Sequence, residues 1–366
     1  MTDTTIGASA NAQSRLEVVD VLRGFALSAL FLVHMVESYE LYWAAPKPGI
    51  ITDTVFLLFL GKSFSLLALC FGFSFFILMD RAAKRGVDFT GRFAWRLLIL
   101  CGIGFLHALV YRGDIIQLLA AMGFVLLLAN RIRDNRVLMG MAVVCFLGPT
   151  LWFQLIASVS GAAWANQPPG YGTDPAMQVY LGGDIVQTFA MNLWTGQLPK
   201  FSFLLDSGRI AEILGLYLVG LVLGRIGFFE RLDQFARARW IALGIAIVAA
   251  AGLHYARQPA YEAFVALGHG QGANRAFAGL IGMWFELAGT TIWALLVIAV
   301  YRSAAQAVTR PFAAMGRLTL TFYVGQSIVF VPVFYNYGLG LHDDWGEGTR
   351  FAVGLAAIAA QMAFAG

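Results

Sequence analysis

The stretch that decides the fold runs from Phe93 to Asn130 and reads FAWRLLILCGIGFLHALVYRGDIIQLLAAMGFVLLLAN. Two apolar runs, each of a length that can enter a bilayer, meet there at the short polar turn 111–114. His107 precedes this turn and Asp114 closes it. An ionisable group inside a membrane costs on the order of 3 kcal/mol. A histidine and an aspartate kept at one end of a membrane hairpin therefore indicate a functional role.

Composition extends this interpretation to the whole chain. Of its 366 residues, 59% are hydrophobic and only 13% are charged, whereas a soluble domain has about 25% charged residues. Some ten long apolar runs follow one another, and helices that are apolar on every side are expected in lipid. The sequence thus predicts an all-α, polytopic transmembrane bundle of about ten spans. We expect one domain over residues 15–366, a disordered tail at 1–14 and an outer lid at 161–205.

The basic residues indicate the orientation of the bundle. Of the 25 lysines and arginines, 16 fall in loops on one side of the predicted spans and six on the other. This asymmetry predicts a cytoplasmic N-terminus. It also accounts for the net charge of +4 without a nucleic-acid partner. The three cysteines lie inside apolar runs with no CxxC spacing, so neither a disulfide nor a metal site is expected.

The first two predicted spans carry charged residues. The first, 19–42, carries Asp20 three residues before Arg23, a spacing that lets the two side chains pair. The second, 55–79, is interrupted at Gly61 and Lys62. The remaining spans are expected at 93–110, 115–130, 137–158, 207–228, 240–254, 278–301 and 318–337, with a short tenth at 350–366. Within the lid, the amphipathic stretch 176–194 is expected to lie on the membrane surface with its apolar face down.

Six polar side chains from four spans are predicted to lie in the outer half of the membrane: His107, Asp114, His34, Glu37, Arg209 and Glu212. A histidine beside a carboxylate can act as a general base or accept an acyl group. Arg209 or Lys62 could then stabilise developing negative charge. The alternative is purely structural, with His107 donating to a backbone carbonyl at a helix crossing. A metal site at His34 and Glu37 is a weaker alternative, because it offers only two ligands.

Four segments together resemble the YeiB-like bacterial membrane proteins, which carry a domain of unknown function. They are RLEVVDVLRGFALSALFLVHM (15–35), GKSFSLLALCFGFSF (61–75), RLLILCGIGFLHALVYRGDIIQLLAAMG (96–123) and GRLTLTFYVGQS (316–327), in the order typical of that family. This family in turn is similar to transmembrane acyltransferases such as heparan-alpha-glucosaminide N-acetyltransferase. The resemblance implies that an acyl group, for example acetyl, moves from cytoplasmic acyl-CoA to a sugar, lipid or small-molecule acceptor at the outer face.

The resemblance also implies which residues form the site. The matching positions are Asp20, Arg23, Gly24, Lys62, Phe71, Gly72, His107, Gly113, Asp114, Gly316, Arg317, Tyr323, Gln326 and Ser327. His34 departs from the family, which more often has asparagine there, so two histidines compete for the catalytic role. The resemblance implies acyl-CoA, membrane lipid and the acceptor as partners, and a bacterial inner membrane as the location. Small residues such as Gly102 and Gly104 would permit a second copy of the chain to pack closely in a homodimer.

Two alternative functions use the same residues. The buried charges could serve as a proton relay in a transporter or exporter of a small solute or lipid-linked molecule, and the break at Gly61 favours this function. No inverted repeat is visible in the sequence, which argues against it. A non-catalytic scaffold or sensor would need these polar groups for stability alone.

Overall fold

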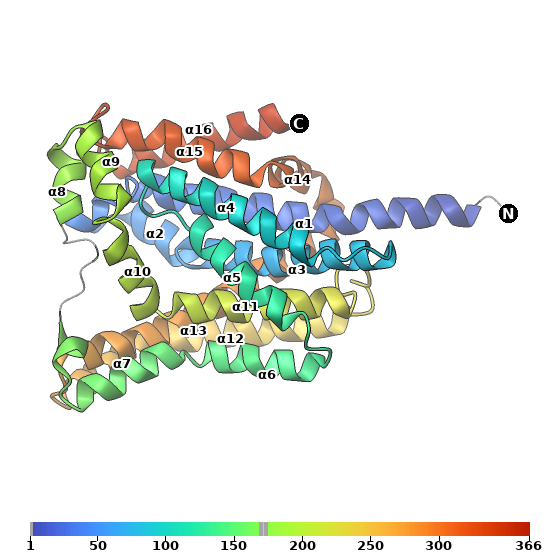
Figure 1. The fold of residues 1–366 in the computed structure, drawn as a ribbon, viewed down its shortest axis with the longest axis horizontal. Coiled ribbons are helices and arrows are strands. Elements are labelled where there is room, and N and C mark those ends of the chain that lie inside the picture. The colour runs from blue at the N-terminus through green and yellow to red at the C-terminus, as the bar shows by residue number, and fades with distance from the viewer. Residues whose placement is uncertain (1–2, 168–170, 172–174) are drawn as a thin grey trace.

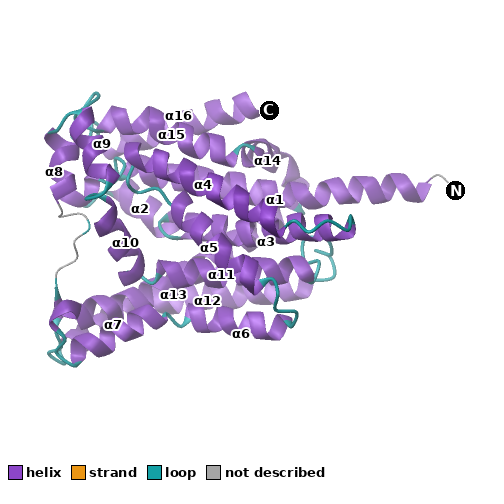
Figure 2. Cartoon of the chain, viewed as in Figure 1, coloured by secondary structure: helices purple, strands orange, loops and turns teal. Residues whose placement is uncertain are grey.

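A computed structural model describes residues 3–167, 171 and 175–366, and of residues 3–16 it describes the backbone alone. Within these residues every regular element is a helix and no strand is present (Figure 2). The helices are α1 Asp3–Val36, η1 Leu41–Ala44, α2 Ile50–Phe59, α3 Lys62–Lys84, α4 Thr90–Val110, α5 Ile116–Ala129, α6 Asn135–Phe146, α7 Pro149–Val159, η2 Ala163–Asn166, α8 Pro175–Gly182, α9 Ile185–Leu193, α10 Gln197–Asp206, α11 Arg209–Arg225, α12 Ala236–Val265, α13 Gln271–Tyr301, η3 Ala304–Thr309, α14 Arg310–Arg317, α15 Thr319–Phe334 and α16 Glu347–Ala365.

Several of these helices can cross a membrane. In the described part of the chain, seven helical segments are long and apolar enough, or up to nine if each of two bent helix pairs counts as one span. The predicted span 115–130 corresponds to α5, whose 14 residues are short for a full crossing. The membrane character and the helical class are therefore as expected from the sequence, while these candidate spans do not confirm the predicted number of about ten.

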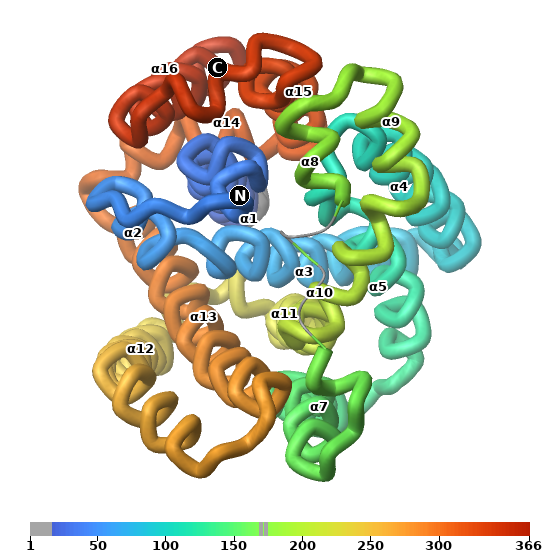
Figure 3. The backbone as a smooth tube through the Cα atoms, turned by 90° about the vertical axis from the view of Figure 1, so that its left-hand side faces the viewer, coloured from blue at the N-terminus to red at the C-terminus, as the bar shows by residue number. Residues whose placement is uncertain are grey.

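The longest helices run side by side along the long axis of the molecule (Figure 1). Helix α1 is the most enclosed span, because 78% of the residues in its apolar stretch are buried. It is surrounded by α2, α3, α14 and α16 (Figure 3). Helix α3 crosses the middle of the bundle and packs on both α11 and α13. Helix α11 contacts α6, while α13 contacts α7 and α12. Residues 175–206 form one end of the bundle, the α8–α10 end, and the opposite end is the α14 end (Figure 1).

The predicted hairpin is present as α4, a turn at 111–115 and α5. The predicted break at Gly61 is also present, because Gly61 has a φ of 79° and separates α2 from α3. The first span ends earlier than predicted, at Val36 instead of Tyr42. At its start, α1 includes residues 3–14, where a disordered tail is expected. Three alanines there favour a helix.

The lid contains two short helices, α8 and α9, which are separated at Gly183. Asp184 is the N-cap of α9 and forms a capping box, in which its side chain accepts from the backbone N–H of Gln187 and the Gln187 side chain accepts from the backbone N–H of Asp184. The lid also packs on the bundle, because Asn192 Nδ2 donates to the carbonyl of Leu109 at 2.9 Å.

Candidate functional site

The α8–α10 end contains a strained turn directly after α1. Ser38, Tyr39 and Glu40 have φ values of 50°, 50° and 80°. Left-handed backbone costs roughly 1–2 kcal/mol per non-glycine residue. Three such residues in succession persist only if their surroundings hold them, and strain of this kind gathers at functional sites.

Two arginines hold this turn. Arg350 of α16 donates from Nη1 to the carbonyl of Val36 at 2.9 Å and to Ser38 Oγ at 2.8 Å. Arg112 of the α4–α5 turn donates from Nε to Glu40 Oε2 at 2.8 Å, and both side chains of this ion pair are buried. Sequence reasoning missed the pairing of Glu40 with Arg112, because the two lie 72 positions apart.

His34 and Glu37 form the first histidine–carboxylate pair. The Nδ1 atom of His34 lies 2.8 Å from Glu37 Oε1, and Trp43 Nε1 donates to Glu37 Oε2 at 3.0 Å. The hydroxyl of Tyr111 approaches the same His34 Nδ1 at 3.2 Å. Within the described residues, Nε2 of His34 makes no hydrogen bond. A proton shared between Nδ1 and Glu37 leaves the lone pair on Nε2, as a general base requires.

His107 and Asp114 form the second pair, as the hairpin predicted. His107 Nδ1 lies 2.8 Å from Asp114 Oδ1, and Asp114 Oδ2 accepts the backbone N–H of Gln117 at 3.1 Å. The ring of Tyr323 lies beside His107, with 5.2 Å between the centroids. Nε2 of His107 is buried and has no hydrogen-bond partner in the part of the chain that the structure describes. Its lone pair is therefore available for bond formation.

A cavity of about 420 Å³, the histidine cavity, lies at the α8–α10 end. It is lined by His34, Glu37, Glu40, Trp43, Tyr111 and Arg209, and by residues of α3 and α10 around them. Arg209 stacks on the rings of Phe64 and Phe203, 4.9 Å and 5.0 Å from their centroids. The cavity thus offers aromatic walls, carboxylates and one guanidinium to a polar ligand.

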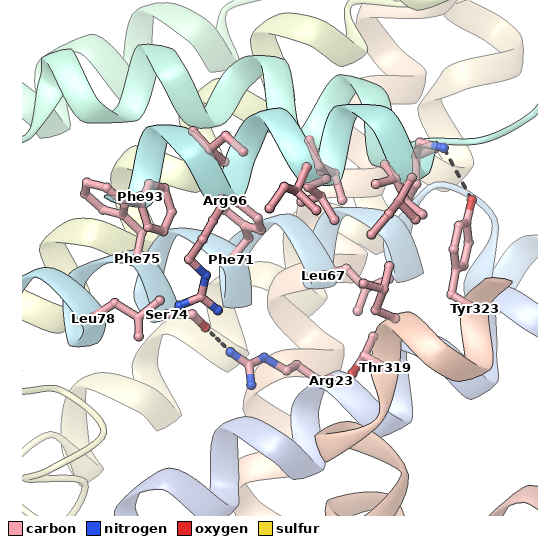
Figure 4. A pocket seen from close by; sticks show the side chains of 18 of the residues that line it. Arg23, Leu67, Phe71, Ser74, Phe75, Leu78, Phe93, Arg96, Thr319 and Tyr323 are labelled. Carbon is pink, nitrogen blue, oxygen red and sulfur yellow. Dashed lines mark hydrogen bonds between the residues drawn. The ribbon is translucent and has the colours of Figure 1, made fainter. Parts of the chain in front are cut away.

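A second cavity of about 590 Å³, the arginine cavity, is lined mainly by leucine, isoleucine and phenylalanine side chains, most of them from α3, α4 and α5. Its cations are Arg23, Arg96 and Arg317. Figure 4 shows Arg23 and Arg96 approaching Ser74 from opposite walls, and Arg23 donates to the Ser74 hydroxyl. Arg23 also pairs with Asp20 at 3.0 Å. For Arg96 and Arg317, no ion pair occurs within the described residues.

The two cavities meet at Ile115, which lines both. The backbone N–H of Ile115 donates to the Tyr323 hydroxyl at 3.3 Å, at the end of the arginine cavity away from Arg23 (Figure 4). Because Asp114 precedes Ile115 and His107 packs on Tyr323, the second histidine pair lies in the wall between the cavities. His107 itself lines neither of them.

The other predicted site residues divide into two groups. Lys62 and Glu212 are buried behind Arg209 at the break between α2 and α3, where Lys62 Nζ donates to the carbonyl of Leu60 at 3.1 Å. Gln326 points elsewhere, since its Nε2 donates to Gln361 of α16 at 2.8 Å. Ser327 Oγ bonds to the carbonyl of Tyr323, one turn back, at 3.5 Å. Gln326 is therefore directed to α16, and neither Gln326 nor Ser327 lines either cavity.

Sequence reasoning also missed Lys200, which lies buried in α10 and donates from Nζ to Gln117 Oε1 at 3.2 Å. A lysine in an otherwise apolar segment was the available signal, but the lid prediction placed it in an outer loop.

Regarding metals, no three His, Cys, Asp or Glu side chains gather into a potential metal site in residues 3–167, 171 and 175–366.

Comparison with known proteins supports the family expectation at a coarse level. A family model described as "Protein of unknown function (DUF418)" matches residues 223–366. This is the domain of the YeiB-like proteins. The matched part includes α12 to α16, and thus Arg317 and Tyr323, but neither histidine pair.

Two proteins of bacilli are similar to the chain. "Uncharacterized protein YxaH" of Bacillus subtilis (strain 168) is 26% identical over 96% of this chain and 89% of its own length. "Uncharacterized 39.9 kDa protein in amylase 3'region" of Bacillus acidopullulyticus is 28% identical over 33% of this chain and 36% of its own length. Their names state no activity, so the function must be argued from the site.

Proposed function

We propose that the chain is an integral-membrane acyltransferase that moves an acyl group from acyl-CoA to an acceptor hydroxyl or amine. The observation that carries this proposal is the meeting of the two cavities at Ile115, with the His107–Asp114 pair in the wall between them. One cavity is apolar with arginines, and the other is polar with a histidine. A transferase that takes its two substrates from opposite faces of a membrane needs this arrangement.

The arginine cavity suits the donor. Arg23, Arg96 and Arg317 supply guanidinium groups of the kind that bind phosphates, and the apolar walls beyond them suit the extended arm of CoA. With the N-terminus in the cytoplasm, as the basic loops predict, the α14 end and this cavity face the cytoplasmic side of a bacterial inner membrane. The histidine cavity then opens on the outer side, where a sugar, lipid or small-molecule acceptor binds.

The two histidine pairs suit two successive steps. In the first, Nε2 of His107 attacks the acyl carbonyl, the C–S bond breaks, and the thiolate leaves and is protonated by solvent. Asp114 stabilises the charge on the acylated imidazole ring. In the second step, Nε2 of His34 takes the proton of the acceptor, whose oxygen or nitrogen bonds to the carbonyl carbon. Release of His107 and transfer of the His34 proton to water complete the turnover.

Thiol release from acyl-CoA by purified protein tests this order. The wild type should turn over repeatedly when acceptor is present. His34→Gln should release about one thiol per chain and accumulate an acyl group that mass spectrometry locates on His107. His107→Ala should release none, and His269→Ala, in the α12–α13 loop, should behave as the wild type. Full activity in His107→Ala, or no binding of acyl-CoA by calorimetry, would end the proposal.

The structure also offers support for a second candidate function, transport. Two helix pairs are sharply bent beside the cavities, α10 with α11 by 66° and the η3–α14 segment with α15 by 78°. Discontinuous helices that end at a central site are typical of secondary transporters. Uptake into liposomes that depends on a pH gradient, without thiol release from acyl-CoA, would favour transport over acyl transfer.

A further inference from the structure

Glu212 of α11 is a buried carboxyl group that neither step of the proposed acyl transfer uses. Its side chain is almost completely enclosed, with 1% of the residue exposed. The charged groups that act on it are Glu286 of α13, Arg209 of its own helix and Lys62 of α3. Of the other helices packed on α11, α10 carries Lys200 and Asp206, α6 carries Arg136, and α5 has no charged residue.

The hydroxyl of Ser65 reveals the state of this carboxyl group. Ser65 Oγ lies 2.8 Å from the carbonyl oxygen of Gly61 and 2.6 Å from Glu212 Oε1. A serine hydroxyl has one hydrogen and can donate it once. If Glu212 were ionised, one of these two short contacts would join two oxygen atoms with no hydrogen between them. If Glu212 carries a proton, it donates to Ser65, Ser65 donates to Gly61, and both contacts are hydrogen bonds.

The second carboxyl oxygen also indicates that Glu212 is protonated. Glu212 Oε2 is buried and has no hydrogen-bond partner among the described residues. Among the described residues, no lysine or arginine nitrogen lies close enough to either Glu212 oxygen, within 4.0 Å, to form an ion pair. A buried carboxylate oxygen with no donor is costly, and neutralisation by a proton is the usual remedy.

We propose that Glu212 is a proton-binding site that controls the break between α2 and α3. When it is protonated, Ser65 bonds to the carbonyl of Gly61, the residue that forms the break. When it is ionised, the Ser65 hydrogen turns to Glu212 and that bond is lost. Leu60, Gly61 and Ser63 line the histidine cavity, so the change reaches the cavity wall. Gly61 also lies against the Glu286 carboxylate, which leaves no room for a side chain there.

Infrared spectroscopy of the full-length protein in lipid nanodiscs tests whether the proton is present. At neutral pH the wild type should show the carbonyl stretch of a protonated carboxyl group, and this band should be lost in Glu212→Gln. Glu262→Gln, which changes an exposed carboxyl group of α12, should keep it. Glutamine is a suitable probe because its amide can donate to Ser65 as the protonated acid does. An identical band in wild type and Glu212→Gln would overturn the proposal.

Cysteine labelling tests whether the proton controls the break. Leu60→Cys is introduced after the native cysteines at 70, 101 and 145 are replaced by alanine, once with Glu212 and once with Glu212→Gln. The ratio of the two labelling rates cancels the titration of the thiol itself. The labelling rate with Glu212, divided by the rate with Glu212→Gln, should rise as the pH is raised, because Glu212 can ionise and glutamine cannot. A ratio that stays constant would refute the control of the break. Neither measurement requires acyl transfer, so both stand apart from the proposed function.

Discussion

Nδ1 of His107 lies 2.8 Å from Oδ1 of Asp114, seven residues later, and both side chains are almost completely buried. Removing either partner leaves the other buried without its hydrogen bond, which costs about 1–3 kcal/mol. His107→Ala and Asp114→Ala should each lower the free energy of unfolding by that amount. The double variant should lose less than the sum, because the interaction can be lost only once.

Denaturant unfolding in detergent measures this cycle. The exposed hydrogen bond from Ser202 Oγ to Asp206 Oδ2, 3.1 Å long, provides the control pair. Ser202→Ala and Asp206→Ala should be nearly additive. If the two changes at His107 and Asp114 are just as additive, the contact contributes nothing to stability and Asp114 cannot be what holds the imidazole.

Glycines set the contact between α1 and α14, which positions Arg317 at the arginine cavity. A Cβ atom on Gly24 would collide with the backbone carbonyl of Phe312, and one on Gly316 with that of Asp20. Gly24→Ala or Gly316→Ala should therefore separate the two helices and cost about 1–3 kcal/mol. Gly325→Ala on α15, where nothing lies near the added carbon, is the matched control.

Thermal unfolding followed by circular dichroism distinguishes these three variants. The control should unfold close to the wild type or slightly above it, since alanine favours a helix more than glycine does. If Gly24→Ala and Gly316→Ala unfold at the temperature of the control, the close approach of α1 and α14 is not needed for stability.

Arg350 should be needed to keep the turn at 38–40 in its left-handed conformation. Arg350→Ala removes one hydrogen bond to this turn, at Ser38, and one to Val36 at the end of α1, and should lower stability by about 1–3 kcal/mol. Ser38→Gly alone removes the hydrogen bond from Arg350 to the Ser38 hydroxyl, but it introduces a residue that adopts positive φ without strain. In the Arg350→Ala background that bond is already absent, so Ser38→Gly should restore part of the lost stability.

Unfolding curves of the two single variants and the double variant decide this point. The effect of Ser38→Gly should be more favourable with alanine at 350 than with arginine. An equal effect in both backgrounds would mean that Arg350 does not hold the turn.

Local spacing in the sequence predicted much of the site. Asp20 pairs with Arg23, and His34 with Glu37, because residues three apart on a helix are neighbours. The contact between His107 and Asp114 also follows from local sequence, because the short turn between two long apolar runs places Asp114 beside the end of the first run. These predictions needed no knowledge of how the helices pack.

Packing decided what the sequence could not predict. The turn at 38–40 contains no glycine, so its left-handed backbone depends on Arg112 and Arg350 from distant parts of the chain. Gln326 was expected at the site from the family motif, but the rotation of α15 directs it to Gln361. The division of the two histidines between a cavity and a wall also depends on helix rotation, which composition and spacing leave open.

The last prediction concerns the pH dependence of stability at Glu40. Burial raises the pKa of Glu40 above its ordinary value of 4.5, and the neighbouring Arg112 opposes this shift. Between the unfolded and the folded pKa, the folded state binds more protons than the unfolded one. The contribution of Glu40 to stability is thus fully present below pH 4.5 and is lost as the pH rises through the folded pKa. Glu40→Gln keeps a neutral side chain and has no such loss. The difference in unfolding free energy between Glu40→Gln and the wild type should therefore shift in favour of the variant as the pH rises. Parallel stability curves across this range would show that Arg112 fully compensates the burial of Glu40.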